Sequence, residues 1–446
     1  MSLQEQIKAH IQNNYERIKD IADHVYAHPE TGFNEVETQK FIEWILNDMR
    51  LSYFKMSGGV PGIKVTLDSG KKGAHVALVA ELDAIVCPTH PDSNEQGVIH
   101  ACGHNIMIAD VLGSLMAFKD LNVMDELSGK VSFMFVPAEE YIELEERQKL
   151  VNEGKIQYPV GKAEAMFQGF FDDIDIAVMI HAMPATYKFG LEGGSNGFIA
   201  KTATYKGKAS HAASAPQNGL NSLYAANLAL SSINAVRETF VDWGNIRVHP
   251  VISKSSDVVN VIPDSTVIET FVRANDVEVI TDTNLKVEKA LVAGALAIGC
   301  EVEINSTAGM MPFNLNADLT ALGRKVASGL VKAEDDVRQL PPTAGSTDLG
   351  DVSCVIPAIE TCIGCISGGL HSADYKVLDK DTDTAYVLGT QYLSLMAHEL
   401  LKDDSKLAKE VVKNYKPVFA SKQEYFDYLD DLSVTKRYNT KANPLI

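Results

Sequence analysis

Short apolar runs in this chain end at residues that carry carboxylate or imidazole groups. The runs are 75–80, 131–136, 174–180 and 355–365, and the groups that follow them are Glu81, Asp83, Glu139, Glu140, His181 and His371. Ligands of an open α/β sheet bind beyond the carboxyl ends of its strands. The pattern therefore predicts that these side chains gather in one crevice, as donors for metal ions would.

The spacing of apolar positions predicts helices over 7–28 and 35–46, with a break at 28–32 between them. From 60 to 184, apolar strand runs alternate with helices such as 106–121. Alternating strands and helices form right-handed βαβ units. We therefore expect an α/β fold whose mostly parallel sheet carries helices on both faces.

The pattern changes after residue 195. Strands with partial alternation are predicted at 201–206, 246–253, 265–273 and 301–306, and long helices at 220–240 and 277–297. This order is typical of a compact α+β sandwich. After about residue 314 the first pattern returns, with helices at 319–331 and 382–401. The predicted domains are 1–195 together with 312–402, an inserted domain 196–311, and a C-terminal extension 403–446 without an assigned function.

The composition is that of a soluble globular protein large enough for two domains. The chain has 446 residues, of which 46% are hydrophobic and 22% are charged. Its 40 basic and 59 acidic residues give a formal net charge of −19, which disfavours nucleic acids and anionic membranes as partners. We see no spanning apolar segment and no basic stretch followed by an apolar one near Met1, and we expect a cytoplasmic protein.

Six cysteines are scattered through the chain, and free thiols are expected rather than a disulfide framework. Cys362 and Cys365 have the spacing of a redox or zinc pair. They lie, however, within an apolar strand-like run, and no second pair completes a four-sulfur site. Two buried structural thiols are the preferred interpretation, and a redox protein that uses the pair is an alternative.

Cys102 and His104 lie two residues apart, before an apolar helix that Asn105 is predicted to cap. A thiolate and an imidazole at this spacing suit zinc or a neighbouring first-row metal. A buried cysteine beside a structural histidine explains the pair equally well. The pair becomes informative only together with the other donors.

Glu139 and Glu140 follow an apolar run and Pro137. Adjacent side chains of a regular strand face opposite ways, but a bend at the strand end can bring both to a metal. One carboxylate can then bind the metal while the other takes a proton from water, which suits amide hydrolysis. Paired glutamates more often lie on solvated surfaces, an interpretation that the preceding apolar run disfavours.

The remaining candidates are weak when they are taken singly. His181 ends an apolar run, where a hydrogen-bonded core histidine is the commoner case, and His371 follows a glycine-rich turn that permits close approach. Asp83 stands where it could orient a metal-binding imidazole. Glu81 could act in the same way or face solvent.

Seven short motifs follow one another along the chain. They are His-Pro-Glu-Thr-Gly-Phe-Asn-Glu (28–35), Glu-Leu-Asp-Ala (81–84), His-Ala-Cys-Gly-His-Asn (100–105), Pro-Ala-Glu-Glu (137–140), Lys-Ala-Ser-His-Ala-Ala (208–213), Asn-Val-Ile-Pro (260–263) and Leu-His-Ser (370–372). The ordered set resembles the M20 metallopeptidases, in the amidohydrolase branch (M20D) of aminoacylases, hippurate hydrolases, auxin-conjugate hydrolases and aminobenzoyl-glutamate hydrolases. The resemblance covers roughly residues 15–400, and the ordered set is far more specific than any single motif.

This resemblance implies a two-metal site and a role for each motif residue. The implied metal ligands are Cys102, His104, Glu140, His181 and His371, with Glu139 as the general base. The inserted domain would be a lid and the dimer contact, and its His211 would reach the partner subunit's active site to stabilise the oxyanion. Asn260 and Arg273 would bind substrate. Without the family, solvent-exposed positions would be the preferred interpretation for His211 and Arg273.

Two departures narrow the resemblance. Many relatives in this branch read Cys-Gly-His-Asp with another histidine shortly afterwards, whereas here Asn105 is followed by Ile, Met and Ile. Together with the stretch 345–353, the asparagine is more typical of the aminobenzoyl-glutamate hydrolase and dipeptidase-like subgroup. The chain between Glu140 and His181 is longer than in compact relatives, and we expect a surface helix over 143–155 that could shape substrate access.

The sequence thus predicts an enzyme that hydrolyses an amide or peptide bond in a small N-acyl amino acid, an aminobenzoyl-glutamate-like compound or a dipeptide. We expect metal-activated water with Glu139 as general base, and a homodimer or a higher homo-oligomer. Two divalent ions are implied, zinc first, with manganese, cobalt or nickel as alternatives. A non-catalytic metal-binding or interaction protein on the same scaffold is the alternative, which the intact pair Glu139 and Glu140 disfavours.

Overall fold

The computed structural model describes residues 1–439 and divides the chain into two packing units. The first unit contains residues 1–193, 314–342 and 351–418, and the second contains 194–313, 343–350 and 419–439. The chain passes from the first unit to the second after residue 193 and returns after residue 313. Both positions lie within two residues of the predicted boundaries at 195 and 312. The predicted extension is divided between the units, and its residues 440–446 lie outside the described chain. The catalytic and lid roles stay predictions.

A nine-stranded sheet forms the centre of the first unit. Its strands, in spatial order, are β1 (Phe54–Lys55), β2 (Ile63–Asp68), β6 (Lys130–Val136), β3 (His75–Glu81), β7 (Ile176–Pro184), β15 (Ala358–Ser367), β8 (Phe189–Leu191) and β14 (Val337–Gln339), with β16 (Lys376–Val377) paired to β15. The central strands β6, β3, β7 and β15 run parallel and are mostly buried. This confirms the predicted α/β class with a mostly parallel sheet, and it brings four carboxyl ends to one edge.

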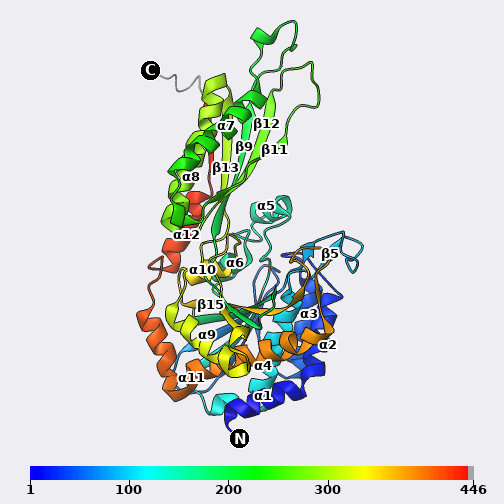
Figure 1. Ribbon diagram of the computed structural model, residues 1–446, viewed down its shortest axis with the longest axis vertical. Helices are drawn as coiled ribbons and strands as arrows, with labels where there is room; N and C mark the ends of the chain where they lie inside the picture. The colour runs from blue at the N-terminus through cyan, green and yellow to red at the C-terminus, as the bar shows by residue number, and fades with distance from the viewer. Residues whose placement is uncertain (440–446) are drawn as a thin grey trace. The chain divides into compact units, whose positions relative to one another are not determined.

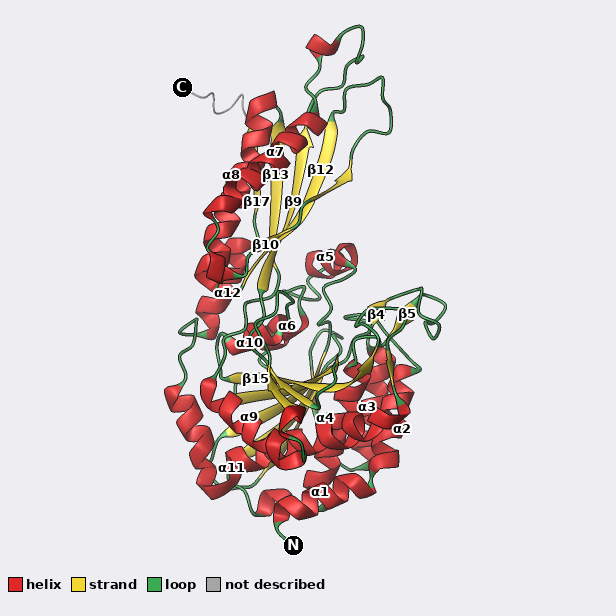
Figure 2. Cartoon of the chain, in the orientation of Figure 1, coloured by secondary structure: helices red, strands yellow, loops and turns green. Residues whose placement is uncertain are grey.

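Helices pack around this sheet (Figures 1 and 2). They are α1 (Leu3–Asn13), α2 (Tyr15–Tyr26), α3 (Val36–Asp48), α4 (His104–Asp120), α6 (Gly161–Phe167), α9 (Ala317–Leu330) and α11 (Gly389–Asn414); α5 (Leu144–Asn152), the short α10 (Leu349–Ser353), β4 (Ile85–Val86) and β5 (Val98–Ile99) lie in connecting segments. α4 is buried on all sides because it contacts β3, β6 and β7 as well as α2 and α11. No helix within residues 1–439 is long and apolar enough to cross a membrane.

The second unit is a six-stranded antiparallel sheet that packs against two long helices (Figure 1). Its strands, in spatial order, are β10 (Arg247–Val248), β12 (Ser265–Ala274), β9 (Gly197–Lys206), β13 (Glu301–Ala308) and β17 (Thr435–Asn439), with β11 (Val251–Lys254) also paired to β12. The helices α7 (Ser222–Val236) and α8 (Val277–Ile298) pack against each other and against the sheet, and α12 (Lys422–Leu432) contacts β13. Buried residues alternate along β9 and β12, as in a sheet with one covered face.

The C-terminal tail supplies β17, an edge strand that its polar sequence does not predict. β17 pairs with β13, and two of its side chains reach Glu288 on α8. Oε1 of Glu288 accepts hydrogen bonds from Nζ of Lys436 (2.9 Å) and the hydroxyl of Tyr438 (2.6 Å), while Nζ of Lys201 lies 3.4 Å from Oε2. Charge-assisted hydrogen bonds therefore hold this strand.

A buried carboxyl group lies where α4 meets α11. Oδ1 of Asp110 accepts a hydrogen bond from the hydroxyl of Thr390 (2.7 Å), and Asp110 is fully buried. Gly389 faces the other oxygen, where a methyl group would collide with Oδ2. Burial raises the pKa of Asp110 well above its ordinary value. The packing therefore favours the neutral carboxyl group.

We expect Asp110→Asn to stabilise the protein by an amount that grows with pH. The native pKa of Asp110 lies above the unfolded value of about 3.9, so the native protein holds the extra proton between the two values and loses stability as pH rises through that window. Asparagine does not titrate. Urea unfolding at about pH 5 and about pH 8 measures the difference, with Asp20→Asn at an exposed position of α2 as the control. A difference that is independent of pH would contradict the raised pKa.

Candidate metal centre

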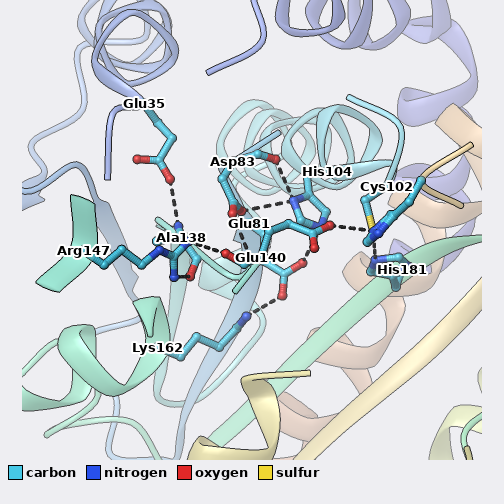
Figure 3. Close-up of polar contacts among 11 residues, drawn as sticks. Glu35, Glu81, Asp83, Cys102, His104, Ala138, Glu140, Arg147, Lys162 and His181 are labelled. Carbon is cyan, nitrogen blue, oxygen red and sulfur yellow. Dashed lines mark hydrogen bonds and ion pairs between the residues drawn. The ribbon is translucent and has the colours of Figure 1, made fainter. Parts of the chain in front are cut away.

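A tight turn before α4 brings two predicted donors to the carboxyl edge of the sheet, beside His181 of β7 (Figure 3). Gly103, between Cys102 and His104, has a φ of 87°. A methyl group on Gly103 would lie 2.8 Å from Cβ of Ala182. Only glycine combines this backbone conformation with so close an approach, and the turn places both donors next to β7.

The start of α4 differs from the prediction. Gly103 rather than Asn105 is the N-cap residue, and Asn105 lies within the first turn. The side-chain amide of Asn105 donates to the carbonyl of Ala22 (3.3 Å). Because the left-handed turn at Gly103 begins the helix at His104, the asparagine joins α4 to α2 instead of capping it.

The donor atoms form two sets that share Cys102. One set is Cys102, His104 and His181, and the other is Cys102, Glu140 and His371; within each set the three donor atoms lie within 4.8 Å of one another. Sγ of Cys102 lies 3.6 Å from Nε2 of His181, and Nε2 of His371 lies 2.8 Å from Oε1 of Glu140. A third set, Glu81, His104 and Glu139, meets the same distance limit. Cys102 is therefore a candidate ligand in both sets.

Burial of the donors fits a metal centre. Glu139 and Glu140 are 8% and 7% exposed, so they are not the solvated pair of the alternative interpretation. Among residues 1–439, the buried atoms Nε2 of His104, Oε2 of Glu81 and Oε1 of Glu140 make no regular hydrogen bond, and their close contacts are ion pairs within the cluster, Glu81 with His104 (3.0 Å) and Glu140 with His371 (2.8 Å). Buried polar atoms in proteins are nearly always hydrogen bonded. Donors left in this state, with a thiol and imidazoles among them, suit zinc or a neighbouring first-row ion.

Asp83 contacts members of both donor sets. Nδ1 of His104 lies 2.8 Å from the carbonyl oxygen of Asp83 and 3.2 Å from its Oδ1. This contact favours a proton on Nδ1 and leaves Nε2 to bind a metal. Oδ2 of Asp83 accepts a hydrogen bond from the N–H of Glu140 (2.9 Å). One carboxylate thus orients residues of both sets, the kind of role that its sequence position predicts.

The charges of the cluster shift its protonation equilibria. Burial and the neighbouring Glu140 raise the pKa of Cys102 well above its ordinary value. Burial lowers the pKa of His181 to about 4, so its imidazole is neutral. Burial also opposes the charged form of His104, but Glu81 and Cys102 outweigh it and raise the pKa of His104. Metals bind thiolates and neutral imidazoles, so binding would release protons.

A buried ion pair that is not evident from the sequence lies behind the donors. Lys162 of α6 is fully buried, and its Nζ pairs with Oε1 of Glu81. Oε2 of the same carboxylate lies 3.0 Å from Nε2 of His104. Burial opposes ionisation of Glu81, but Lys162 and His104 outweigh it and lower the pKa of Glu81. Glu81 therefore stays charged without facing solvent. The only sequence signal was a lysine within the largely apolar stretch 160–167.

Cys362 and Cys365 are structural thiols. All six cysteines are buried and free, as predicted. The pair lies three residues apart on β15, and a register shift between Gly364 and Ile366 interrupts the strand at Cys365. Sγ of Cys362 contacts Oε1 of Glu192 (3.2 Å), and burial raises the pKa of both thiols. These features disfavour the redox alternative, which needs accessible thiolates.

Two residues implied by the motifs are neighbours in the second unit. The N–H of Ala212 donates to the carbonyl of Asn260 (3.0 Å), and both His211 and Asn260 are exposed. Nδ1 of His211 accepts hydrogen bonds from the N–H groups of Ala213 and Ser214, each at 3.2 Å. Nε2 therefore carries the proton of the neutral ring and can donate it to another molecule.

Arg273 lies near the far end of β12 from Asn260. Asn260 precedes the strand, and Arg273 follows Ser265, its first residue, by eight positions, about 26 Å of extended chain. The guanidinium donates to the hydroxyl of Ser346 (2.7 Å) and lies 4.9 Å from the ring centroid of Phe198. Within one chain, a small substrate therefore does not reach both Arg273 and Asn260.

Known proteins share this architecture. The family model described as Peptidase family M20/M25/M40 matches residues 77–399. Xaa-Arg dipeptidase of Mus musculus is 30% identical over 65% of this chain and 61% of its own length, so the match spans less than two thirds of that relative. N-acetyl-L-cysteine deacetylase of Bacillus subtilis (strain 168) is 26% identical over 87% of this chain and 89% of its own. A Bacillus subtilis crystal structure, described as a dinuclear metal binding peptidase from the M20 family, gives a TM-score of 0.69 at 20% identity, over 87% of this chain and 99% of that one.

We expect Lys162→Met to destabilise the metal-free protein by about 3–5 kcal/mol, because it leaves the charge of Glu81 buried without its partner. Glu81→Gln in the same background should recover much of the loss. Urea unfolding in the presence of a chelator measures both effects. Lys155→Met, which removes an exposed lysine paired with Glu153, is the control. A loss no larger than that of the control would mean that the buried pair does not stabilise the fold.

Proposed function

The chain belongs to peptidase family M20/M25/M40, and from this we propose that it hydrolyses an amide or peptide bond in a small N-acyl amino acid, an aminobenzoyl-glutamate-like compound or a dipeptide. The observation that carries the proposal is the sharing of Cys102 by two donor sets, with Glu139 close to one of them. Relatives named as a dipeptidase and a deacetylase support this class of substrate.

The two donor sets would each hold one divalent ion. Cys102, His104 and His181 would bind the first, and Cys102, Glu140 and His371 the second. When bound, such ions supply a water molecule of lowered pKa and polarise the substrate carbonyl. Zinc is expected first, with manganese, cobalt and nickel as alternatives, and elemental analysis of the purified protein distinguishes them.

Glu139 is the proposed proton carrier. Its carboxylate lies within 4.8 Å of donor atoms of Glu81 and His104 but belongs to neither set that shares Cys102. Glu139 would take a proton from the attacking water and deliver it to the leaving amine. Asp83 would hold the ring of His104, and the Nε2–H of His211 would donate to the carbonyl oxygen as negative charge develops there.

We further propose a homodimer in which His211 and Asn260 of one chain serve the active site of the other. The separation of Asn260 from Arg273 along β12 supports this division, because one small substrate can meet both only if two chains supply them. The edge strand β11 exposes Val251 (57%) and Ile252 (38%), and such an edge can pair with a second copy. A cytoplasmic location stays a prediction.

Glu139→Gln should keep the metal and lose about 10²- to 10⁴-fold in turnover, because a carboxamide cannot accept the proton. The neighbouring change Glu140→Gln should instead weaken metal binding. Elemental analysis and a screen of N-acyl amino acids, aminobenzoyl-glutamate and dipeptides measure the two effects. Full activity of metal-loaded Glu139→Gln would exclude this residue as the base. A wild-type protein that binds metal but hydrolyses none of these compounds would favour the non-catalytic alternative.

Mixed dimers test whether His211 acts across subunits. Neither Glu139→Gln nor His211→Ala homodimers should be active, but a mixed dimer keeps one site in which both residues are intact if His211 comes from the partner. Co-expression with random assembly should then restore roughly a quarter of wild-type activity. Activity no greater than that of the two variants mixed as separate homodimers would place His211 at the site of its own chain.

A further inference from the structure

The turn that carries Glu139 has an unusual backbone. Ala138, the residue before it, has a φ of 55°. Residues with a side chain rarely adopt this left-handed conformation, and it persists only where the surrounding structure holds it. The groups that hold it are seen in Figure 3.

Side chains from three separate segments bind the backbone of residues 138–140. Oε1 of Glu35 accepts the N–H of Ala138 (2.8 Å), and Oδ2 of Asp83 accepts the N–H of Glu140 (2.9 Å). The guanidinium of Arg147 donates to the carbonyls of both Ala138 (3.4 Å) and Glu140. The carbonyl before Glu139 and the N–H after it are therefore both engaged, which restricts the direction of its side chain.

Arg147 comes from α5, in the segment between Glu140 and His181 for which the sequence predicts a surface helix. Its side chain is buried all the same, with the residue only 2% exposed. A further hydrogen bond joins the guanidinium to the carbonyl of Pro159 (2.6 Å), in the middle of this segment. The guanidinium thus ties α5 and the chain at Pro159 to the turn 138–140.

Residues of the motif at 28–35 pack against this guanidinium. Arg147 lies over the ring of Phe33, 5.3 Å from its centroid, an arrangement that is favourable for a cation. A methyl group on Gly32 would lie 2.6 Å from a guanidinium nitrogen, so this position has to be glycine for the arginine to fit. Glu35 of the same motif holds Ala138. The motif at 28–35, which has no part in the proposed chemistry, therefore contacts both the turn 138–140 and Arg147 of the segment 141–180.

We propose that Arg147 is a positioning residue that holds the turn 138–140, so that Glu139 and Glu140 keep their separate directions. The segment 141–180, which carries Arg147, is thereby part of the catalytic apparatus. The inference rests on the proposed function. Arg147 is not placed to bind a substrate carboxylate, because it is buried and donates to backbone carbonyls. The planar guanidinium of arginine can donate to two carbonyls at once, whereas the ammonium of lysine is a single point charge.

The test compares Arg147→Lys and Arg147→Ala with Lys149→Met, which removes an exposed lysine from the same helix. For both Arg147 variants we expect kcat to fall by about 10- to 100-fold and the affinity for one of the two metal ions to fall by a similar factor. KM should change by less than about twofold, because substrate contacts are not removed. Lys149→Met should behave as wild type. Guanidinium chloride at low millimolar concentration should restore part of the kcat of Arg147→Ala, and an equal concentration of sodium chloride should not.

Three results would overturn the proposal. One is a folded Arg147→Lys with the kcat and metal affinity of wild type. Another is a rise in KM at unchanged kcat, which would make Arg147 a substrate-binding residue. The third is unfolding of both variants without relief by guanidinium, which would make it a residue of the fold alone. If wild type hydrolyses no amide, the proposed function fails, but metal titration of Arg147→Lys against Lys149→Met still shows whether Arg147 positions Glu140.

Discussion

The contacts of Asp83 decide how the donor residues of this protein are arranged. At the end of β3, Asp83 contacts the ring of His104 at the start of α4 and the backbone N–H of Glu140 after β6. Burial opposes its ionisation, but the hydrogen bond and charge of His104 and the charge of Arg147 lower its pKa below the ordinary value. A buried carboxylate is tolerated only while such partners surround it. Asp83 therefore joins the start of α4 to the turn after β6 at the candidate metal centre.

The other buried carboxyl groups near this edge are in different states for the same physical reason. Glu81 is charged because Lys162 and His104 face it. Burial and the negative charge of Asp83 raise the pKa of Glu35 well above its ordinary value, which favours the neutral form beside Ala138. Glu81 and Asp83, the two carboxyl groups whose pKa is lowered, each contact the imidazole of His104.

The second unit uses a buried carboxylate for a different purpose. Glu288 joins α8 to Lys201 of β9 and to two residues of β17, so charge-assisted contacts add to the backbone pairing of this edge strand with β13. Burial lowers the pKa of Lys201 to about 8 in spite of Glu288. The tail closes one edge of the sheet, next to β13, while β10 and β11 lie along the opposite edge. The proposed contact between copies would use that second edge.

The sequence by itself determined the α/β class, the mostly parallel sheet and the placement of donors after its strands, because apolar periodicity and strand ends are local properties of a chain. Only the tertiary structure decided which donors share Cys102, that Gly103 rather than Asn105 caps α4, and that Lys162 and Arg147 are buried. Lys162 and Glu81 are 81 positions apart. A lysine or arginine in a short helix has the same local pattern whether it faces solvent or a buried carboxyl or carbonyl oxygen. The burial of such a charge is settled by the partners that the fold brings to it from elsewhere in the chain.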